Sequence, residues 1–181
     1  MTDTTDPPPT IGPRRRGAPA GRLLPDIEQV RTINEAAFDT GDEADLVDAL
    51  RRDRAWIDGL SMLSIDPNTG RPVGYALLTR CHVGRTPALA LAPCAVLPEF
   101  QRRGAGYAAI EAVLNAARNV GERWVIVLGH PDYYPRFGFT RASAAGIRLS
   151  IDVPDDALMV LALNGGDPPS GIVRYAPPFD I

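Results

Sequence analysis

The 181-residue sequence predicts a single domain of the α/β class. The length suits one ordinary domain, and 45% hydrophobic with 23% charged residues is the balance of a chain that buries a full core. Segments with helical periodicity alternate with short runs rich in Val, Leu and Ile, which are typical of buried strands. We therefore expect one fold over residues 21–181.

The first 20 residues have a different composition. Five prolines occur there among Thr, Asp, Gly and Arg, and such a mixture does not supply the apolar area that folding requires. The sequence predicts a disordered tail over 1–20, in which the basic cluster Arg14–Arg16 is solvated.

Two helices are expected at the start of the domain. Leu23–Leu24 indicate a short first strand, and Asp26 is placed to cap a helix whose apolar residues recur at helical spacing as far as Phe38. Asp42 is placed to cap a second helix, which carries an apolar stripe and ends near Arg54. Each helix therefore has an apolar side and a charged side.

Three strands follow the helices. The runs 60–66 and 72–83 are predicted to form a hairpin, because Asp66–Gly70 between them holds the Pro, Asn and Gly that such connections need. Residues 88–97 form the third strand, but Pro93 has no backbone donor and belongs at an edge or a bulge. We expect this strand to be kinked at Pro93.

The remaining elements continue the alternation. They are a helix at 104–120, a strand at 124–128, a short helix at 131–137, strands near 146–152 and 157–163, and an extended segment at 172–179. The long helix places Tyr107, Ile110 and Leu114 on one apolar face, and Gly121 is placed to end it.

Composition and charge argue against several classes of function. A net charge of −3 offers no general attraction to nucleic acid or anionic lipid. No apolar run is long enough to span a bilayer, and Cys81 and Cys94 are expected as reduced thiols in the core. With two histidines and no paired cysteine motif, a metal site is not expected. We expect a cytoplasmic protein without a nucleic-acid or membrane partner.

The strongest local signal is the loop Gln101–Gly106, between the kinked strand and the long helix. Its glycines let backbone N–H groups turn toward one point, and a helix N-terminus carries partial positive charge, so the loop suits a phosphate group. The helix opens with Arg102 and Arg103 and has no acid in its first turn, an arrangement that an anion would stabilise. Taken alone, the pattern is better explained by a solvated basic turn.

The neighbouring residues exclude two common nucleotide-binding loops. A Walker-type loop ends in Gly-Lys-Ser/Thr, and a dinucleotide fingerprint has a third Gly and a later acid, neither of which is present. Coenzyme A, which has a pyrophosphate and needs no metal-holding Ser/Thr, is compatible with the loop. Backbone groups of the kinked strand from Cys94 to Val96 could then hydrogen-bond the pantetheine amides.

Two longer segments resemble a known family. Residues 91–106, which end in Gln-Arg-Arg-Gly-Ala-Gly, resemble the acetyl-CoA motif of the GNAT superfamily. Residues 125–139, which contain Tyr-Tyr-Pro-Arg-Phe-Gly-Phe, are similar to the signature of the YhbS-like branch of predicted bacterial N-acetyltransferases. Segments 153–160 and 174–179 match the same branch, so the resemblance covers residues 21–181.

The resemblance implies a mixed, mostly antiparallel sheet of six or seven strands with about four helices, splayed between the strands at 88–97 and 124–129. It also implies direct transfer of an acetyl group from acetyl-CoA to a primary amine of an unidentified acceptor, without a metal. The residues expected to contact acetyl-CoA are Cys94, Ala95, Val96, Gln101, Arg102, Arg103, Gly104, Ala105, Gly106, Tyr134 and Phe137.

Tyr134 occupies the family position whose tyrosine donates a proton to the departing CoA thiolate. A phenol with a reference pKa of about 10 is protonated at neutral pH and suits that role. The alternative is that the tyrosines and phenylalanines of this segment form an aromatic core cluster, which is the preferred interpretation for Tyr133 and Phe139.

Three routes could remove the proton of the amine acceptor. His130 is the first candidate, because it ends a strand beside the proposed site and imidazole has a reference pKa of about 6.5. Glu99 and a path through water are the alternatives. His130 could instead contact the substrate or cap the turn.

Other functions and acceptors stay open. The CoA motif binds the nucleotide and does not select the acyl group. One alternative is therefore transfer of another acyl group from CoA, and the other is a non-catalytic CoA-binding sensor or regulatory module. The acidic residues that could attract a cationic amine are Glu35, Asp39, Asp42, Glu43 and Asp45. A solvated helix face is the more common explanation of such a set. The protein is expected to be a monomer or a homodimer.

Overall fold

The computed structural model describes residues 24–181. The predicted tail over 1–20 and Leu23 lie outside the described residues. The α-helices are α1 Leu24–Ala37, α2 Asp42–Arg52 and α3 Ala105–Asn119. The strands are β1 Ser61–Ile65, β2 Pro72–Val83, β3 Thr86–Val96, β4 Trp124–Leu128, β5 Thr140–Arg141, β6 Ile147–Arg148, β7 Leu158–Ala162 and β8 Gly171–Arg174. Short 3-10 turns are η1 Pro98–Phe100, η2 Tyr134–Phe137, η3 Ala142–Ala145 and η4 Pro177–Phe179.

The predicted beginnings of the first two helices are wrong in detail. Helix α1 already includes Leu24, so the strand expected there does not form, and Asp26 lies inside the helix rather than at its cap. Gly41 is the N-cap of α2, and Asp42 is its first helical residue. The acidic first turn and basic last turn of α2 complement the helix dipole, which stabilises this placement.

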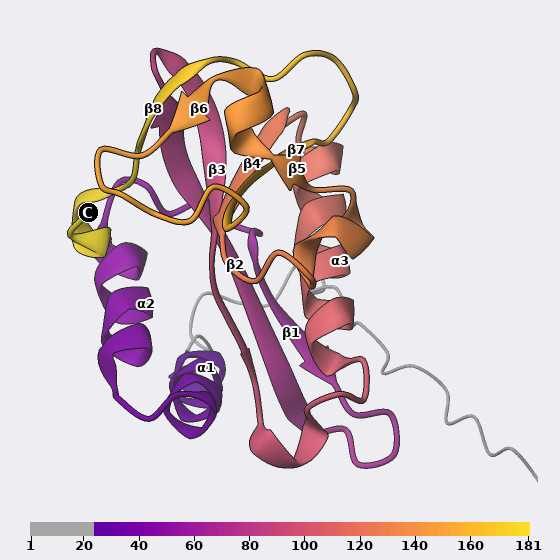
Figure 1. Ribbon diagram of the computed structural model, residues 1–181. Helices are drawn as coiled ribbons and strands as arrows, with labels where there is room; N and C mark the ends of the chain where they lie inside the picture. The colour runs from indigo at the N-terminus through magenta and orange to yellow at the C-terminus, as the bar shows by residue number, and fades with distance from the viewer. Residues whose placement is uncertain (1–23) are drawn as a thin grey trace, which may run out of the picture.

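The strands form one mixed sheet in the order β5-β7-β4-β3-β2-β8-β6, with β1 paired to β2. The β3–β4 and β6–β8 pairs are parallel, and the other pairs are antiparallel. This confirms the expected mixed, mostly antiparallel sheet; the short strands β5 and β6 bring the number of described strands to eight. Helix α3 covers one face of the sheet and α1 and α2 cover the other (Figure 1).

The short helix predicted near 131–137 is the 3-10 turn η2, which begins at Tyr134 rather than at Pro131. Pro135 at its start has no backbone donor, and Gly138 ends it in a left-handed conformation with φ of 92°. The described residues therefore contain three α-helices instead of about four.

Strands β3 and β4 separate soon after they meet. Their parallel pairing is limited to Leu89 with Val125 and Ala90 with Ile126. Strand β3 instead stays with β2 as far as Val96, with a shift of register opposite Ala92–Pro93. The predicted irregularity at Pro93 and the splay between β3 and β4 are thus confirmed. The edge of β3 beyond Ala90 faces the opening of this splay.

Helix α3 packs on the sheet through mostly small side chains. Its buried residues are Ala105, Ala108, Ala109, Ile110, Val113, Leu114 and Ala117. The first turn approaches β2 so closely that a Cβ on Gly74 would lie 3.1 Å from the Ala105 carbonyl oxygen. A large ring does not fit in this contact. Tyr107, predicted on the buried face, is instead 44% exposed.

Candidate functional site

The N-terminus of α3 presents free backbone donors at the open end of the splay. Gly104 is the N-cap in the left-handed conformation, with φ of 85°, and its carbonyl accepts the first helical hydrogen bond, from Ala108 N–H at 2.9 Å. The N–H groups of residues 105–107 therefore precede the first intrahelical bond. The first turn contains no acid to bind them. Such a helix start attracts an anion through both hydrogen bonds and the helix dipole.

A glycine lets the end of β3 approach this helix turn. A Cβ on Gly106 would lie 3.1 Å from Val96 Cγ2 and 3.2 Å from the Tyr133 hydroxyl. The Gln101 side chain also reaches the strand, donating from Nε2 to the Val96 carbonyl at 3.4 Å. The strand end, the loop and the helix start therefore meet at one place. A side chain on residue 106 would fill this cradle, so the residues present fit a phosphate group.

The predicted pantetheine-binding residues lie along the edge of β3 that leads to the cradle. Ala95 and Val96 pair with Tyr75 and Gly74 of β2 on one side. On the other side, pairing with β4 ends at Ala90. An unpaired strand edge offers N–H and C=O groups to an extended ligand with amide groups.

The loop Gln101–Gly106 contains two exposed arginines. Arg102 and Arg103 are both exposed, and neither forms an ion pair with another described residue. Arg102 also has a positive φ of 61°, an uncommon conformation for a residue other than glycine. The two guanidinium groups leave the loop positively charged, in agreement with an anion site.

Tyr134 lies within the splay, beside Cys94 of β3. Its ring packs so closely over Gly129 that a Cβ there would collide with the ring. The Cys94 thiol is a close neighbour of the Tyr134 phenol, and each affects the pKa of the other. Burial is the main reason that the pKa of Tyr134 is raised well above its ordinary value, and burial raises the pKa of Cys94 to about 12. Both groups therefore keep their protons at neutral pH.

The two base candidates occupy different places. His130 follows β4 and its side chain is exposed, while its carbonyl accepts hydrogen bonds from Tyr133 N–H at 3.1 Å and Tyr134 N–H at 3.4 Å. The His130 backbone thus holds the turn that presents the two tyrosines. Glu99 lies in η1, and its carboxylate binds the Arg71 guanidinium at 3.1 Å on the surface.

Known proteins share this arrangement. Residues 27–139 match the family model described as the acetyltransferase (GNAT) family, which is more than half of the chain. The chain belongs to the GNAT acetyltransferase family. A GNAT relative from Escherichia coli K12, the uncharacterized N-acetyltransferase YjhQ, is 38% identical over 118 residues, which are 63% of this chain and 64% of the relative. The chain therefore matches less than two thirds of that relative's length.

Two solved structures have the same GNAT fold. The YhbS acetyltransferase of Escherichia coli, in complex with CoA, has a TM-score of 0.78 at 24% identity and covers 99% of this chain and 97% of its own. A GNAT family acetyltransferase from Brucella melitensis, in complex with acetyl-CoA, has a TM-score of 0.72 at 28% identity, covering 94% and 97%. The predicted YhbS-like branch is consistent with these similarities.

An aromatic cluster lines one side of the GNAT splay. Phe139 is buried, as predicted for a core residue, whereas Tyr133 is only half-buried and its hydroxyl faces Gly106. Phe137 stacks on Tyr107 of α3 with a centroid distance of 5.0 Å. Sequence reasoning missed Tyr107 as a site residue, because helical periodicity placed it in the core. Its position three residues after Gly104 was the available signal.

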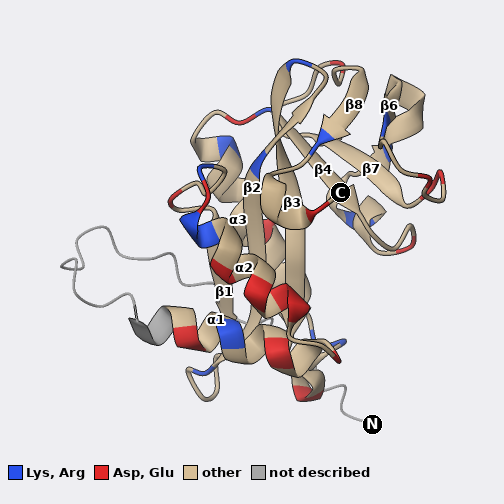
Figure 2. Cartoon of the chain, turned by 90° about the vertical axis from the view of Figure 1, so that its left-hand side faces the viewer, with Lys and Arg blue, Asp and Glu red and all other residues tan. Residues whose placement is uncertain are grey.

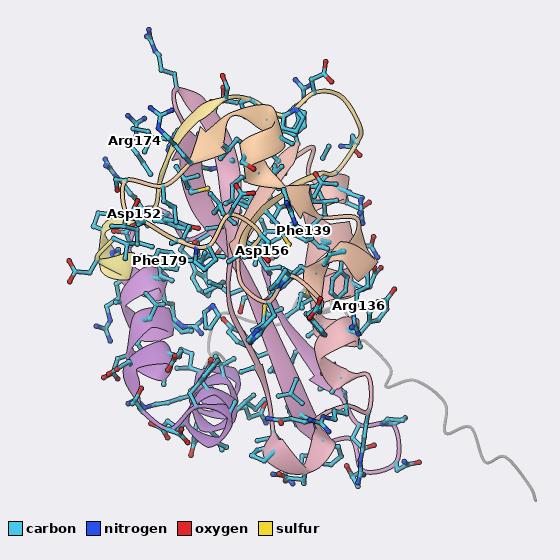
Figure 3. All side chains as sticks on the ribbon, in the orientation of Figure 1. Arg136, Phe139, Asp152, Asp156, Arg174 and Phe179 are labelled. Carbon is cyan, nitrogen blue, oxygen red and sulfur yellow. The ribbon has the colours of Figure 1, made fainter. Side chains whose placement is uncertain are left out.

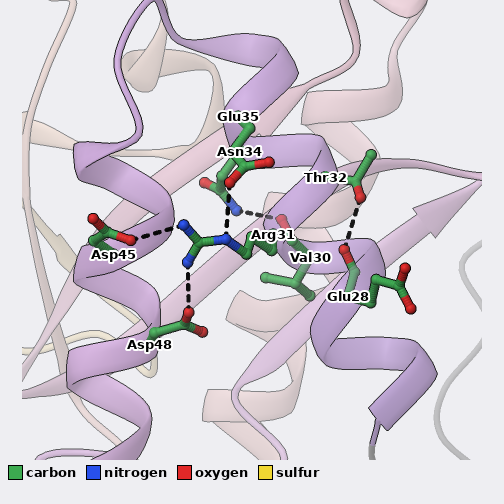
Figure 4. A network of polar contacts seen from close by, with 8 residues as sticks. All are labelled: Glu28, Val30, Arg31, Thr32, Asn34, Glu35, Asp45 and Asp48. Atoms are coloured by element: carbon green, nitrogen blue, oxygen red, sulfur yellow. Dashed lines mark hydrogen bonds and ion pairs between the residues drawn. The ribbon is translucent and has the colours of Figure 1, made fainter.

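Acidic residues gather on α1 and α2, in the region predicted to attract an amine (Figure 2). Arg31 of α1 binds Glu35, Asp45 and Asp48 at 2.8, 2.9 and 2.7 Å (Figure 4). Of the five predicted acidic residues, Asp45 therefore links α2 to α1, whereas Glu35 pairs with Arg31 within α1. The remaining three are the ones left for a contact with an acceptor.

A separate pocket of about 660 Å³ lies at the other end of the sheet. It is lined by Arg80, His82, Thr86, Pro87, Gly121, Glu122, Arg123 and Trp124. These residues lie at the carboxyl end of β2 and at the amino ends of β3 and β4, whereas the splay opens at the carboxyl ends of β3 and β4. Arg80 and Glu122 already neutralise each other there through a two-fold hydrogen-bonded ion pair.

Proposed function

We propose that this GNAT protein transfers an acetyl group from acetyl-CoA directly to a primary amine. The observation that carries the proposal is the group of free N–H donors at the start of α3, which lies at the unpaired edge of β3. The YhbS and Brucella melitensis relatives, named as complexes with CoA and acetyl-CoA, support the same ligand. The thioester supplies the activated acetyl group, and no metal is needed for this chemistry.

Different residues of the chain bind different parts of acetyl-CoA. The N–H groups of the loop Gln101–Gly106, with Arg102 and Arg103, hold the pyrophosphate. Backbone groups of Ala95 and Val96 bind the pantetheine amides along the free edge of β3. Phe137 and Cys94 line the splay together with the other aromatic residues of the cluster.

Tyr134 is the proposed general acid. Its phenol is half-buried and keeps its proton at neutral pH, because burial raises its pKa. In the reaction the proton moves from Tyr134 Oη to the sulfur of the departing thiolate. The Tyr134 ring is held in the splay by its packing over Gly129 and against the aromatic cluster. This proton donor favours an enzyme over a non-catalytic sensor.

His130 is the proposed route for the proton of the amine. Its exposed side chain immediately precedes the turn that carries Tyr134, and an imidazole nitrogen can accept a proton directly or through water. Glu99 is the weaker candidate, because its carboxylate binds Arg71.

We propose that residues 21–181 form one domain and that the protein is a cytoplasmic monomer or homodimer. In the cytoplasm the free thiols Cys81 and Cys94 stay reduced. The acceptor and the preferred acyl group are the next quantities to measure.

Calorimetric titration with acetyl-CoA tests the proposal. Wild-type protein should bind acetyl-CoA, and Gly106→Val should lose at least about tenfold in affinity, because the new side chain fills the cradle beside Val96 and Tyr133. Gly41→Ala is the matched control, since a Cβ at that glycine meets nothing within 4 Å. A folded wild-type protein that does not bind acetyl-CoA would overturn the proposed function.

A further inference from the structure

Tyr107 presents an aromatic ring to solvent directly beside the phosphate cradle. It is the third residue of α3 and follows Gly106. One face of the ring is covered by Phe137, at a centroid distance of 5.0 Å and an interplanar angle of 22°. The side chain is nevertheless 44% exposed, so the ring is held by a buried neighbour and remains available to a flat ligand. Its hydroxyl lies 3.4 Å from Glu111 Oε1, which fixes the ring further.

Arg136 adds a positive charge to the same aromatic group. Its guanidinium lies over the Tyr133 ring, with Cζ at 4.3 Å from the ring centroid, and its Nε donates to the Tyr133 carbonyl at 2.8 Å. The Tyr133 hydroxyl faces Gly106 at the cradle. The Arg136 side chain is exposed and lies next to α3 (Figure 3). Among the described residues, only Nε of this guanidinium donates a hydrogen bond, so the two terminal nitrogens are available to an anion.

Both features lie beside the loop that is proposed to bind the pyrophosphate. A ligand that suits them has a flat aromatic base close to a pyrophosphate, and a further phosphate within reach of a guanidinium. Neither the core nor helix propensity requires an exposed tyrosine in the first turn of α3. We propose that Tyr107 stacks the adenine of CoA and that Arg136 binds its 3′-phosphate. This inference rests on the proposed function, since it assigns the second half of the same donor.

The assignment has a consequence for the acyl donor. Pantetheine and one phosphate are common to CoA and to the arm of an acyl carrier protein, but adenosine 3′-phosphate occurs only in CoA. Stacking on an aromatic side chain and a charge-assisted hydrogen bond both add affinity for that portion. The platform of Tyr107, Phe137 and Arg136 therefore selects free CoA thioesters over carrier-bound ones.

Three probes separate the parts of the site by calorimetry: CoA, 3′-dephospho-CoA and 4′-phosphopantetheine. Tyr107→Leu should bind CoA and dephospho-CoA about tenfold more weakly and 4′-phosphopantetheine unchanged, because only adenine contacts are lost. Tyr107→Phe keeps the ring and should retain wild-type affinity for all three. Thermal melting of the same proteins establishes that they are folded.

Arg136→Gln should weaken CoA about fivefold and leave dephospho-CoA unchanged, because only the 3′-phosphate contact is removed. Arg141→Gln is the control, since it removes another exposed guanidinium, which lies 3.7 Å from Asp155. Equal CoA affinity for wild type and Tyr107→Leu would overturn the platform while leaving the proposed function intact. An equal loss of all three ligands in Tyr107→Leu would also overturn it. Absence of CoA binding by wild type would overturn both proposals.

Discussion

Tyr134 and Cys94 in the splay are both shielded from solvent, and both keep their protons at neutral pH. Tyr134 is held between Gly129 and Cys94, and its raised pKa follows mainly from burial, with the neighbouring Cys94 adding to it. A general acid must hold its proton before the reaction, and the Tyr134 phenol does so; its raised pKa also makes it a weaker acid than an exposed phenol. The same environment makes the fold sensitive to high pH.

The free energy of unfolding should fall above about pH 10. The unfolded phenol of Tyr134 ionises near its ordinary pKa of about 10, whereas the folded phenol has a raised pKa and stays neutral, so rising pH favours the unfolded chain. Below that pH the contribution is complete. Urea unfolding between pH 8 and pH 11 should show Tyr134→Phe losing less stability than wild type, by up to about 1.4 kcal/mol per pH unit.

Tyr75 and Tyr175 also have raised pKa values because they are buried, so the phenylalanine variant should retain part of the alkaline loss. Identical slopes for wild type and Tyr134→Phe would contradict the burial argument. If the free energies of unfolding of the two proteins differ by the same amount at every pH, the substitution changes packing and not the pH dependence of stability.

At the scale of elements, the site depends on the close contact between α3 and β2. Gly74 of β2 lies against Ala105 of the first helical turn and against the buried Ser64 hydroxyl of β1. This contact sets the height of the helix start above the sheet. The position of the phosphate cradle therefore follows from packing between elements as well as from the loop itself.

Gly74→Ala should destabilise the fold by about 1–3 kcal/mol and weaken acetyl-CoA binding. The new Cβ would lie 2.5 Å from Ser64 Oγ and 3.1 Å from the Ala105 carbonyl oxygen. Ser64→Ala alone should be nearly neutral, because this buried hydroxyl has no hydrogen-bond partner among the described residues. Urea unfolding and calorimetry measure the two effects.

The double variant Ser64→Ala/Gly74→Ala should recover only part of the lost stability, since the backbone of Ala105 still obstructs the new methyl group. Full recovery of stability and binding would show that the serine alone requires the glycine.

At the scale of the whole molecule, the carboxyl ends of β3 and β4 differ in structure from their amino ends. The carboxyl ends of β3 and β4 separate to form the splay, while the Arg80–Glu122 ion pair lies near their amino ends. Its two hydrogen bonds, at 2.9 and 2.5 Å, connect β2 to the segment after α3. Among the described helices, none is long and apolar enough to span a membrane.

Glu122→Gln should lower the free energy of unfolding by about 1–3 kcal/mol, because it leaves a partly buried guanidinium without its charge partner. Acetyl-CoA affinity should not change, since the pair lies at the far end of the sheet. Arg141→Gln, which removes an exposed ion pair, should alter stability much less. Loss of acetyl-CoA affinity in Glu122→Gln would show that the two ends of the sheet are coupled.

Patterns over a few neighbouring residues were sufficient to predict several elements of this molecule. The predicted strands 72–83 and 124–128 coincide with β2 and β4, and the irregularity predicted at Pro93 is present, because apolar runs and a missing backbone donor act over a few residues. The loop Gln101–Gly106 was found for the same reason. Its glycines and arginines are adjacent in sequence, so their chemistry is visible without a fold.

Contacts between distant segments decided the rest. Helical periodicity placed Tyr107 in the core, but the first turn of α3 meets β2 through Ala105, and the Tyr107 ring lies outside that contact against Phe137. The short turn η2 replaced a predicted helix, and it brought Tyr134 beside Cys94, forty residues earlier in the chain. Side-chain exposure and partners depend on which surfaces meet in three dimensions. The sequence alone therefore indicated the family and the phosphate loop, while tertiary packing determined which aromatic residues face the splay.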